Sequence, residues 1–231
     1  MVKRLFDIAA AATGLVVCGP VIMLAAALVK LSSRGPAFYC PARAGMNGRP
    51  FTLYKLRTMH VNQSRDASVV TGANDARVFA VGRWLRKLKI DELPQLLNIL
   101  RGDMSIVGPR PEDLKIVEQH YGPMGWQTLQ VRPGLAGVSS IYNYTHGEKL
   151  LTGPNPEQVY AEQLLPVKLA LEVAYLNDAS FGYDVSLIVR TVAAIIRISL
   201  GQQEFPEPPE MATAREILAQ RTSAANPSQA A

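Results

Sequence analysis

The sequence predicts a mainly helical α+β fold: a small cytoplasmic domain associated with a membrane through an N-terminal re-entrant helix. Three observations support this fold class. Residues 8–29 are uncharged and largely apolar, later segments repeat apolar residues with helical spacing, and only one pair of short segments has a strand pattern. With 231 residues, of which 48% are hydrophobic, the chain can bury one sizeable core.

The uncharged N-terminal run is long enough to be a membrane helix, since roughly 20 apolar residues cross a bilayer. A cleaved signal peptide fits less well, because the run is long and ends without a small-residue cleavage site. Basic residues on both sides fit neither orientation of a straight spanning helix. They are Lys3 and Arg4 before the run and Lys30 and Arg34 after it.

Gly19-Pro20 lies in the middle of this run. If Pro20 bends the helix, the segment can return to the side it entered from, and both basic flanks can lie at one anionic surface. We therefore expect a re-entrant helical hairpin. Proline kinks also occur in spanning helices, so that alternative stays open.

Turn-forming residues and apolar spacing predict the elements that follow the membrane helix. Two short strands, around Phe38-Tyr39 and over residues 51–54, are joined by the turn-forming pair Asn47-Gly48. The polar residues 62–76 predict a surface loop. Helices are predicted at residues 81–88, 92–101, 112–121, 156–175 and 183–200.

Composition divides the chain into three parts. Residues 1–34 form the membrane helix with its basic flanks, and residues 35–201 form the cytoplasmic domain. Residues 202–231 are rich in Gln, Glu, Pro, Ala and Ser, which predicts a flexible tail with at most one short helix near 212–221. The two cysteines, Cys18 and Cys40, do not form the pattern of a disulfide framework, which favours a reducing compartment.

The net charge of +5 favours an anionic partner, but acidic lipid, phosphorylated substrates and nucleic acid all meet that description. The sequence lacks the patterns of helix-turn-helix, zinc-finger and aromatic-basic strand motifs. Its basic residues also gather around an acidic pair, which would repel a nucleic-acid backbone. We therefore expect no nucleic-acid partner.

The most informative stretch is residues 89–111, KIDELPQLLNILRGDMSIVGPRP. Proline is tolerated only near the start of a helix, so Pro94 predicts a helix that begins just before it, with Asp91 as N-cap and Glu92 in the first turn. Unpaired N–H groups and the helix dipole favour a carboxylate or a phosphate there. Asp91 and Glu92 are thus candidate catalytic residues, and the alternative is that they only stabilise the helix end.

Basic residues near this pair favour the catalytic interpretation. Lys55 lies in the motif YKLRTM, and the stretch before the pair adds further basic side chains, Arg86 among them. Arg110 and Arg132 lie in Pro-Gly-rich turns, which hold a guanidinium in place for bidentate phosphate binding. For Arg110 a purely structural turn is an equal alternative.

Together these motifs resemble the signature of the bacterial sugar transferases, the small monotopic polyprenyl-phosphate phosphoglycosyl transferases. The resemblance runs from Lys3 to about Ile196 and leaves out the C-terminal tail. Its motifs here are KRLFDI, YKLRTM, GRWLRKLKIDELPQ, GPRP and VRPGLAG. It implies a re-entrant helix broken at a residue-proline pair in the bacterial inner membrane, with the catalytic domain on the cytoplasmic face. Gly19-Pro20 stands here where Ser-Pro is familiar.

The resemblance also implies an activity: transfer of a sugar 1-phosphate from a UDP-sugar to polyprenyl (undecaprenyl) phosphate, as the first step of polysaccharide or glycoconjugate assembly. Asp91 is implied as the nucleophile that displaces UMP, with Glu92 as an acid–base or metal-positioning partner. Magnesium is the expected cofactor, with Asp91 as its protein ligand. The implied substrate-binding residues are Lys55, Arg86, Arg110, Pro111 and Arg132.

Two alternatives to the transferase activity stay open. A non-catalytic membrane adaptor of polysaccharide assembly would keep the fold, but the intact Asp91-Glu92 pair argues against it. Water could instead intercept the intermediate, which would release free sugar phosphate.

Membrane lipid is an expected partner, and the protein could pair as a homodimer through its outward helices or its tail. The segments GLAGVSSIYNY and LLPVKLALEVAYL resemble one branch of the family, and no residue identifies the sugar.

Overall fold

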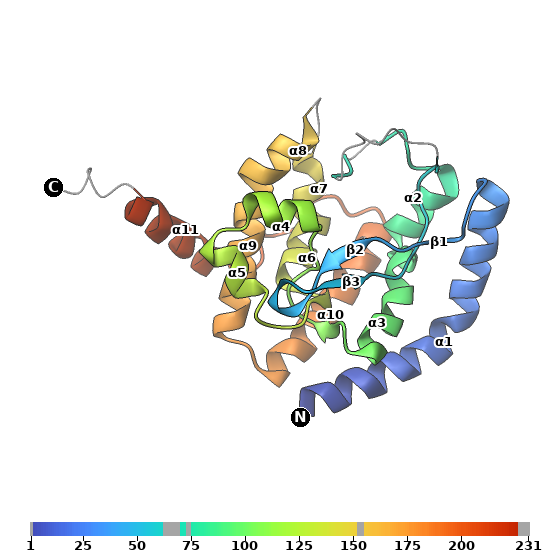
Figure 1. Cartoon of the computed structure of the whole chain (residues 1–231), viewed down its shortest axis with the longest axis horizontal. Coiled ribbons are helices and arrows are strands. Elements are labelled where there is room, and N and C mark those ends of the chain that lie inside the picture. The colour runs from blue at the N-terminus through green and yellow to red at the C-terminus, as the bar shows by residue number, and fades with distance from the viewer. Residues whose placement is uncertain (1, 62–69, 73–74, 152–154, 226–231) are drawn as a thin grey trace.

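The computed structural model describes residues 2–61, 70–72, 75–151 and 155–225, and the side chains as far as residue 221. Of the predicted surface loop at 62–76, residues 62–69 and 73–74 therefore lie outside the described residues. Figure 1 shows a cluster of helices with a small β-hairpin on one side. Helix α1 lies at one end of the long axis and helix α11 at the other.

Helix α1, Val2–Ser32, is a single helix with Pro20 inside it. It is long and apolar enough to cross a membrane, with a mean hydropathy of 2.3, and only 11% of that apolar window is buried in the protein. Figure 1 shows that α1 is curved and follows the side of the domain. The helix is therefore continuous through Gly19-Pro20, and the break expected at that pair is replaced by a curve.

The N-terminal end of α1 is anchored to the domain by charged side chains. Lys3 Nζ lies 2.5 Å from Asp184 Oδ2. The Arg4 guanidinium donates to two carbonyl oxygens in the last turn of α3 (Leu96–Arg101), at 2.6 and 3.0 Å. Asp7 is buried and accepts a hydrogen bond from Ser105 Oγ at 3.1 Å. These side chains fix the start of α1 on the domain.

The C-terminal end of α1 is held by a different residue, Arg57, whose side chain is buried. Its guanidinium donates to Ser33 O at 2.8 Å, to Ser33 Oγ at 2.9 Å and to Pro36 O at 2.6 Å. These oxygens lie at and just beyond the last turn of α1, where carbonyl groups have no partner within a helix. Both ends of the apolar helix therefore contact the same domain.

The predicted hairpin is present, with a different pairing at its base. Strands β2 (Ala42–Ala44) and β3 (Pro50–Thr52) pair antiparallel around a tight turn, Met46–Gly48. Asn47 and Gly48 have φ angles of 58° and 72°, values that Asn and Gly tolerate best. Strand β1 (Phe38–Tyr39) pairs with β4 (Lys55–Leu56), whereas the sequence predicted residues 51–54 as the second strand.

The five predicted helices are all found. They are α2 (Ala80–Lys87), the 3₁₀ turn η2 (Ile90–Gln95) continued by α3, α4 (Leu114–His120), the segment from α8 (Pro156–Val159) to α9 (Leu165–Asn177), and α10 (Phe181–Ser199). The sequence did not predict α5 (Pro123–Thr128), α6 (Val138–Tyr142), the π turn η3 (Asn143–Gly147) and α7 (Glu148–Leu150). It also missed a parallel pair, β5 (Ser105–Val107) with β6 (Gly134–Ala136).

The core is built around α9, which is buried along most of its length and packs against α5, α6 and α11. Leu169 and Leu171 are among its buried side chains. Helix α11 (Met211–Ala225) lies within the predicted flexible tail, 202–231, and is longer than the short helix expected there. Its residues Met211 and Ala214 are buried in the core, so this part of the tail is packed against the domain.

Candidate active site

A cleft of about 810 Å³ lies beside the hairpin and receives side chains from β4, α2, η2 and α9. Its lining is rich in charge. The lysines and arginines are Arg43, Lys55, Arg57, Arg77, Arg83, Arg86, Lys87, Lys89, Arg110 and Lys168, and the acidic residues include Asp91, Glu92 and Glu112. A basic wall around a few carboxylates is suited to a phosphorylated ligand.

The acidic pair lies inside η2 rather than at its start, so the prediction of Asp91 as N-cap is wrong. The N-cap residue is Lys89, whose backbone is left-handed at φ 54° and ψ 20°. Only two residues separate the end of α2 from η2, and the turn begins at Ile90, one residue before Asp91. Gly102, at φ 91°, ends α3 as predicted.

Asp91 is 1% exposed, and its two carboxylate oxygens differ. Oδ2 lies 2.8 Å from the Lys55 ammonium, which β4 supplies. Oδ1 is buried and has no hydrogen-bond partner among the described residues. Since a buried unpaired oxygen is costly, such an atom is a candidate for contact with a substrate atom or a cation.

Glu92 is also buried and is held by Arg110, with Nη2 at 2.6 Å from Oε1 and Nη1 at 3.3 Å from Oε2. Burial alone would raise the pKa of Glu92, but the positive charges of Arg110 and Lys55 outweigh it and hold that pKa well below its usual range. Glu92 is therefore an anion at neutral pH and a weak base. The geometry favours a positioning role over acid–base chemistry.

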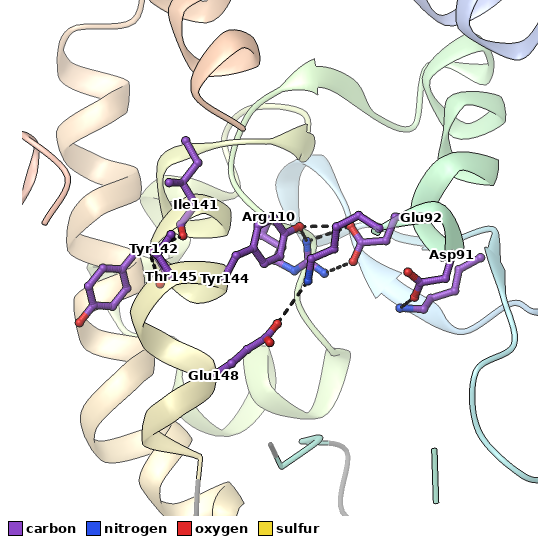
Figure 2. Close-up of polar contacts among 10 residues, drawn as sticks. Asp91, Glu92, Arg110, Ile141, Tyr142, Tyr144, Thr145 and Glu148 are labelled. Carbon is purple, nitrogen blue, oxygen red and sulfur yellow. Dashed lines mark hydrogen bonds and ion pairs between the residues drawn. The ribbon is translucent and has the colours of Figure 1, made fainter. Parts of the chain in front are cut away.

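Tyr144 joins this pair from the π turn η3 and was not predicted. Its hydroxyl donates to Glu92 Oε2 at 3.3 Å and accepts from Arg110 Nη1 at 3.0 Å. Burial raises the pKa of Tyr144 above its usual value, so the phenol keeps its proton. Figure 2 shows Tyr144 lying against Arg110, with Glu92 beside them and Asp91 further along the same turn. A π turn often marks a functional site, but periodicity in IYNYTHG does not reveal it.

A second buried network lies behind Arg110. The Arg110 backbone N–H donates to Glu172 Oε1 at 2.9 Å, and Ser139 Oγ donates to the same oxygen at 2.5 Å. Burial raises the pKa of Glu172 to about 7. Nearby, Lys168 Nζ lies 3.0 Å from Glu112 Oε2. Burial alone would raise the pKa of Glu112, but the positive charge of Lys168 lowers that pKa to about 2. The sequence did not single out Lys168 and Glu172, because α9, which carries both, looks like an ordinary core helix.

Most of the predicted site residues come together. Asp91, Glu92, Lys55, Arg86, Arg110 and Pro111 all line the cleft. Arg132 is not among the residues that line it. Its Nε instead donates to the carbonyl oxygen of Gly102 at 2.8 Å, so the structure gives Arg132 a contact at the end of α3.

The predicted magnesium site is tested by the carboxylates present. No group of three or more His, Cys, Asp or Glu side chains in the described ranges could enclose a metal ion. Magnesium bound to phosphorylated substrates commonly uses one or two protein carboxylates, with water and phosphate oxygens as its other ligands. Asp91, which has an unpaired oxygen and faces the cleft, is a carboxylate that fits that kind of site.

Comparison with known proteins identifies the family. Residues 1–198 match the family model described as bacterial sugar transferase. A UDP-glucose:undecaprenyl-phosphate glucose-1-phosphate transferase of Caulobacter vibrioides is 36% identical over 84% of this chain and 69% of its own length. A second relative, from Aeromonas hydrophila, is named UDP-N-acetylgalactosamine-undecaprenyl-phosphate N-acetylgalactosaminephosphotransferase. It is 33% identical over 84% of this chain, and the match covers 44% of its own length. The exopolysaccharide production protein ExoY of Rhizobium meliloti is 37% identical over 84% of this chain and 85% of its own.

Proposed function

The chain belongs to the bacterial sugar transferase family, and we propose that it transfers a sugar 1-phosphate from a UDP-sugar to undecaprenyl phosphate and releases UMP. The names of its relatives supply the substrate classes. One observation in the site carries the proposal: Asp91 has a buried, unpaired carboxylate oxygen in a cleft lined by basic side chains. Because the relatives use different sugars, the sugar is left open.

The proposed reaction has two displacements at one phosphorus atom. Asp91 Oδ1 attacks the β-phosphorus of the donor, the bond from that phosphorus to the bridging oxygen breaks, and UMP leaves with the electron pair. An oxygen of undecaprenyl phosphate then attacks the same phosphorus and displaces the Asp91 carboxylate. A covalent intermediate divides one difficult displacement into two easier ones.

The neighbours of Asp91 have separable roles in this proposal. Lys55, 2.8 Å from Oδ2, pairs with that oxygen and holds the side chain so that Oδ1 faces the donor. Glu92 and Arg110 hold each other in the wall of the cleft, and Arg86 and Pro111 line the same cleft. Magnesium would be held by Asp91 together with donor phosphate oxygens, and it would neutralise charge on the departing UMP.

The anchoring of α1 supports a re-entrant membrane segment. Lys3, Arg4 and Asp7 contact the domain at one end of the apolar helix, and Arg57 holds the other end. A helix whose two ends contact one compact domain enters and leaves the membrane on the same side. We propose that this side is the cytoplasmic face of the inner membrane, where α1 places the cleft close to its lipid substrate.

The test measures UMP release by the full chain in detergent, with magnesium, undecaprenyl phosphate and a panel that includes UDP-glucose and UDP-N-acetylgalactosamine. We expect release to require the lipid and to be lost in Asp91→Asn, which keeps the size of the side chain. Asp178→Asn, at an exposed position after α9, is the matched control. Release that survives in Asp91→Asn would refute the nucleophile. Absence of release from correctly folded protein across the whole panel would favour the adaptor alternative.

A further inference from the structure

Lys89 has an unusual backbone for its residue type. Among the described non-glycine residues, positive φ angles occur at Asn47 and Lys89. Asn47 lies in a tight turn, and asparagine tolerates this conformation, whereas lysine has no short polar side chain to stabilise it. Strained residues of this kind cluster at functional sites. Here the left-handed turn comes two residues before Asp91, and the Lys89 side chain lines the cleft.

The Lys89 ammonium lies on the face of Tyr144. Its Nζ is 3.7 Å from the centroid of that ring, a close cation–π contact. The same Tyr144 is held by hydrogen bonds to Glu92 and Arg110. The ring is therefore a rigid support, and it holds a positive charge close enough to act on Glu92.

The carboxylate that pairs with Lys89 holds it weakly. Glu148 Oε1 lies 3.3 Å from Lys89 Nζ, and the Glu148 side chain is 53% exposed. Ion pairs this exposed contribute little free energy. By contrast, Lys55, Arg110 and Lys168 pair at 2.8, 2.6 and 3.0 Å with carboxylates that are at most 13% exposed. Lys89 can thus change partner at low cost, while those three cations are committed to the site.

We propose that Lys89 is a ligand for the phosphate groups of the nucleotide donor. It leaves Glu148 when the donor enters and donates a charge-assisted hydrogen bond to a phosphate oxygen, while its ammonium stays close to the Tyr144 ring. Glu148 then acts as a temporary partner that competes with the donor, and Figure 2 shows its carboxylate below Tyr144 in that view. The inference rests on the proposed function, since it takes a nucleotide diphosphate sugar as the ligand.

The first test measures the donor KM and, separately, the Kd of UMP by calorimetry with magnesium present. Lys89→Asn removes the charge and keeps a residue that tolerates the left-handed turn, so the start of η2 is retained. We expect both constants to rise about tenfold, which corresponds to one charge-assisted hydrogen bond, and kcat to change less. Lys89→Arg should restore most of the affinity. Lys115→Met, at an exposed position on α4, should leave both constants unchanged.

Glu148→Gln supplies the decisive comparison. If Glu148 competes with the donor, its removal frees Lys89, and the donor KM and the UMP Kd should fall by about two- to fivefold. If Lys89 and Glu148 form only a structural pair, both substitutions would weaken binding in the same direction. That result, or unchanged UMP binding in Lys89→Asn, would overturn the inference. Failure of the wild-type chain to release UMP would refute the proposed reaction instead, because UMP binding reports on the Lys89 contact by itself.

Discussion

Replacement of Arg110 by methionine should destabilise the protein in a way that depends on pH. The Glu92 side chain is 6% exposed and is held by two hydrogen bonds from the Arg110 guanidinium. Removing one partner of a buried ion pair costs about 3–5 kcal/mol, because the other charge is left without compensation. Since the Arg110 side chain is 25% exposed, we expect a loss near the lower limit, about 3 kcal/mol at pH 7.

The pH dependence follows from the Glu92 carboxyl group. In the native protein the pKa of Glu92 is held below the usual glutamate value. The stability that Glu92 contributes is therefore present above the usual pKa, and it is lost as the pH falls through the lower pKa of the folded state. In Arg110→Met this pKa rises, because burial is then opposed only by Lys55 and Lys89, and protonation relieves the charge that has lost its partner. The loss of stability relative to wild type should therefore be larger at pH 7 than at pH 4.5.

The assay is thermal unfolding of the purified protein in detergent at the two pH values. For a chain of this size, about 3 kcal/mol corresponds to a fall in Tm of roughly 6–12 °C. Glu92→Gln and the double variant complete a cycle, in which we expect a coupling free energy of about 2 kcal/mol between Glu92 and Arg110. Coupling below about 0.5 kcal/mol, or an equal loss at both pH values, would refute the reasoning, because an independent pair gives additive effects.

Three further predictions use other parts of the site. Tyr144→Phe removes only the hydroxyl that joins Glu92 and Arg110, so we expect about 1 kcal/mol lower stability in thermal unfolding and a several-fold lower kcat for UMP release. Glu172 has its pKa raised by burial to about 7, so its contribution to stability is present below the ordinary glutamate pKa and is lost as the pH rises through about 7. Glu172→Gln should flatten the fall of Tm between pH 5 and 8, and an unchanged slope would contradict this. Removal of magnesium with EDTA should abolish UMP release and added magnesium should restore it; full activity in EDTA would remove the cation from the proposal.

The anchoring of α1 illustrates where sequence reasoning ends. The absence of charge in residues 8–29 predicted a long apolar helix, and α1 confirms it. The re-entrant course of that helix stays a prediction. The expected interruption at Gly19-Pro20 is absent, since α1 is continuous and curved. A helix can tolerate proline by bending, so the contacts at its two ends decide its course, and Arg57 and Lys3 make those contacts across the fold.

Local signals explain what the sequence determined by itself. Apolar spacing located the five main helices, and Asn47-Gly48 located the hairpin turn. The motifs that carry the family resemblance pointed to Asp91, Glu92, Lys55, Arg86, Arg110 and Pro111, which all line the cleft. Each signal lies within a few neighbouring residues, where propensity and turn chemistry act directly.

Only the tertiary structure decided which distant side chains meet. It brings Tyr144 to Arg110, Glu172 to the Arg110 backbone and Lys89 to the Tyr144 ring, and it directs Arg132 to the end of α3. It also packs α11 against α9, although composition predicted a flexible tail. These outcomes depend on how the helices pack and where the chain turns, as at the left-handed Lys89 and in the π turn that carries Tyr144. Local periodicity does not encode them, because the partners are far apart in the sequence and their contact becomes favourable only when the core excludes water.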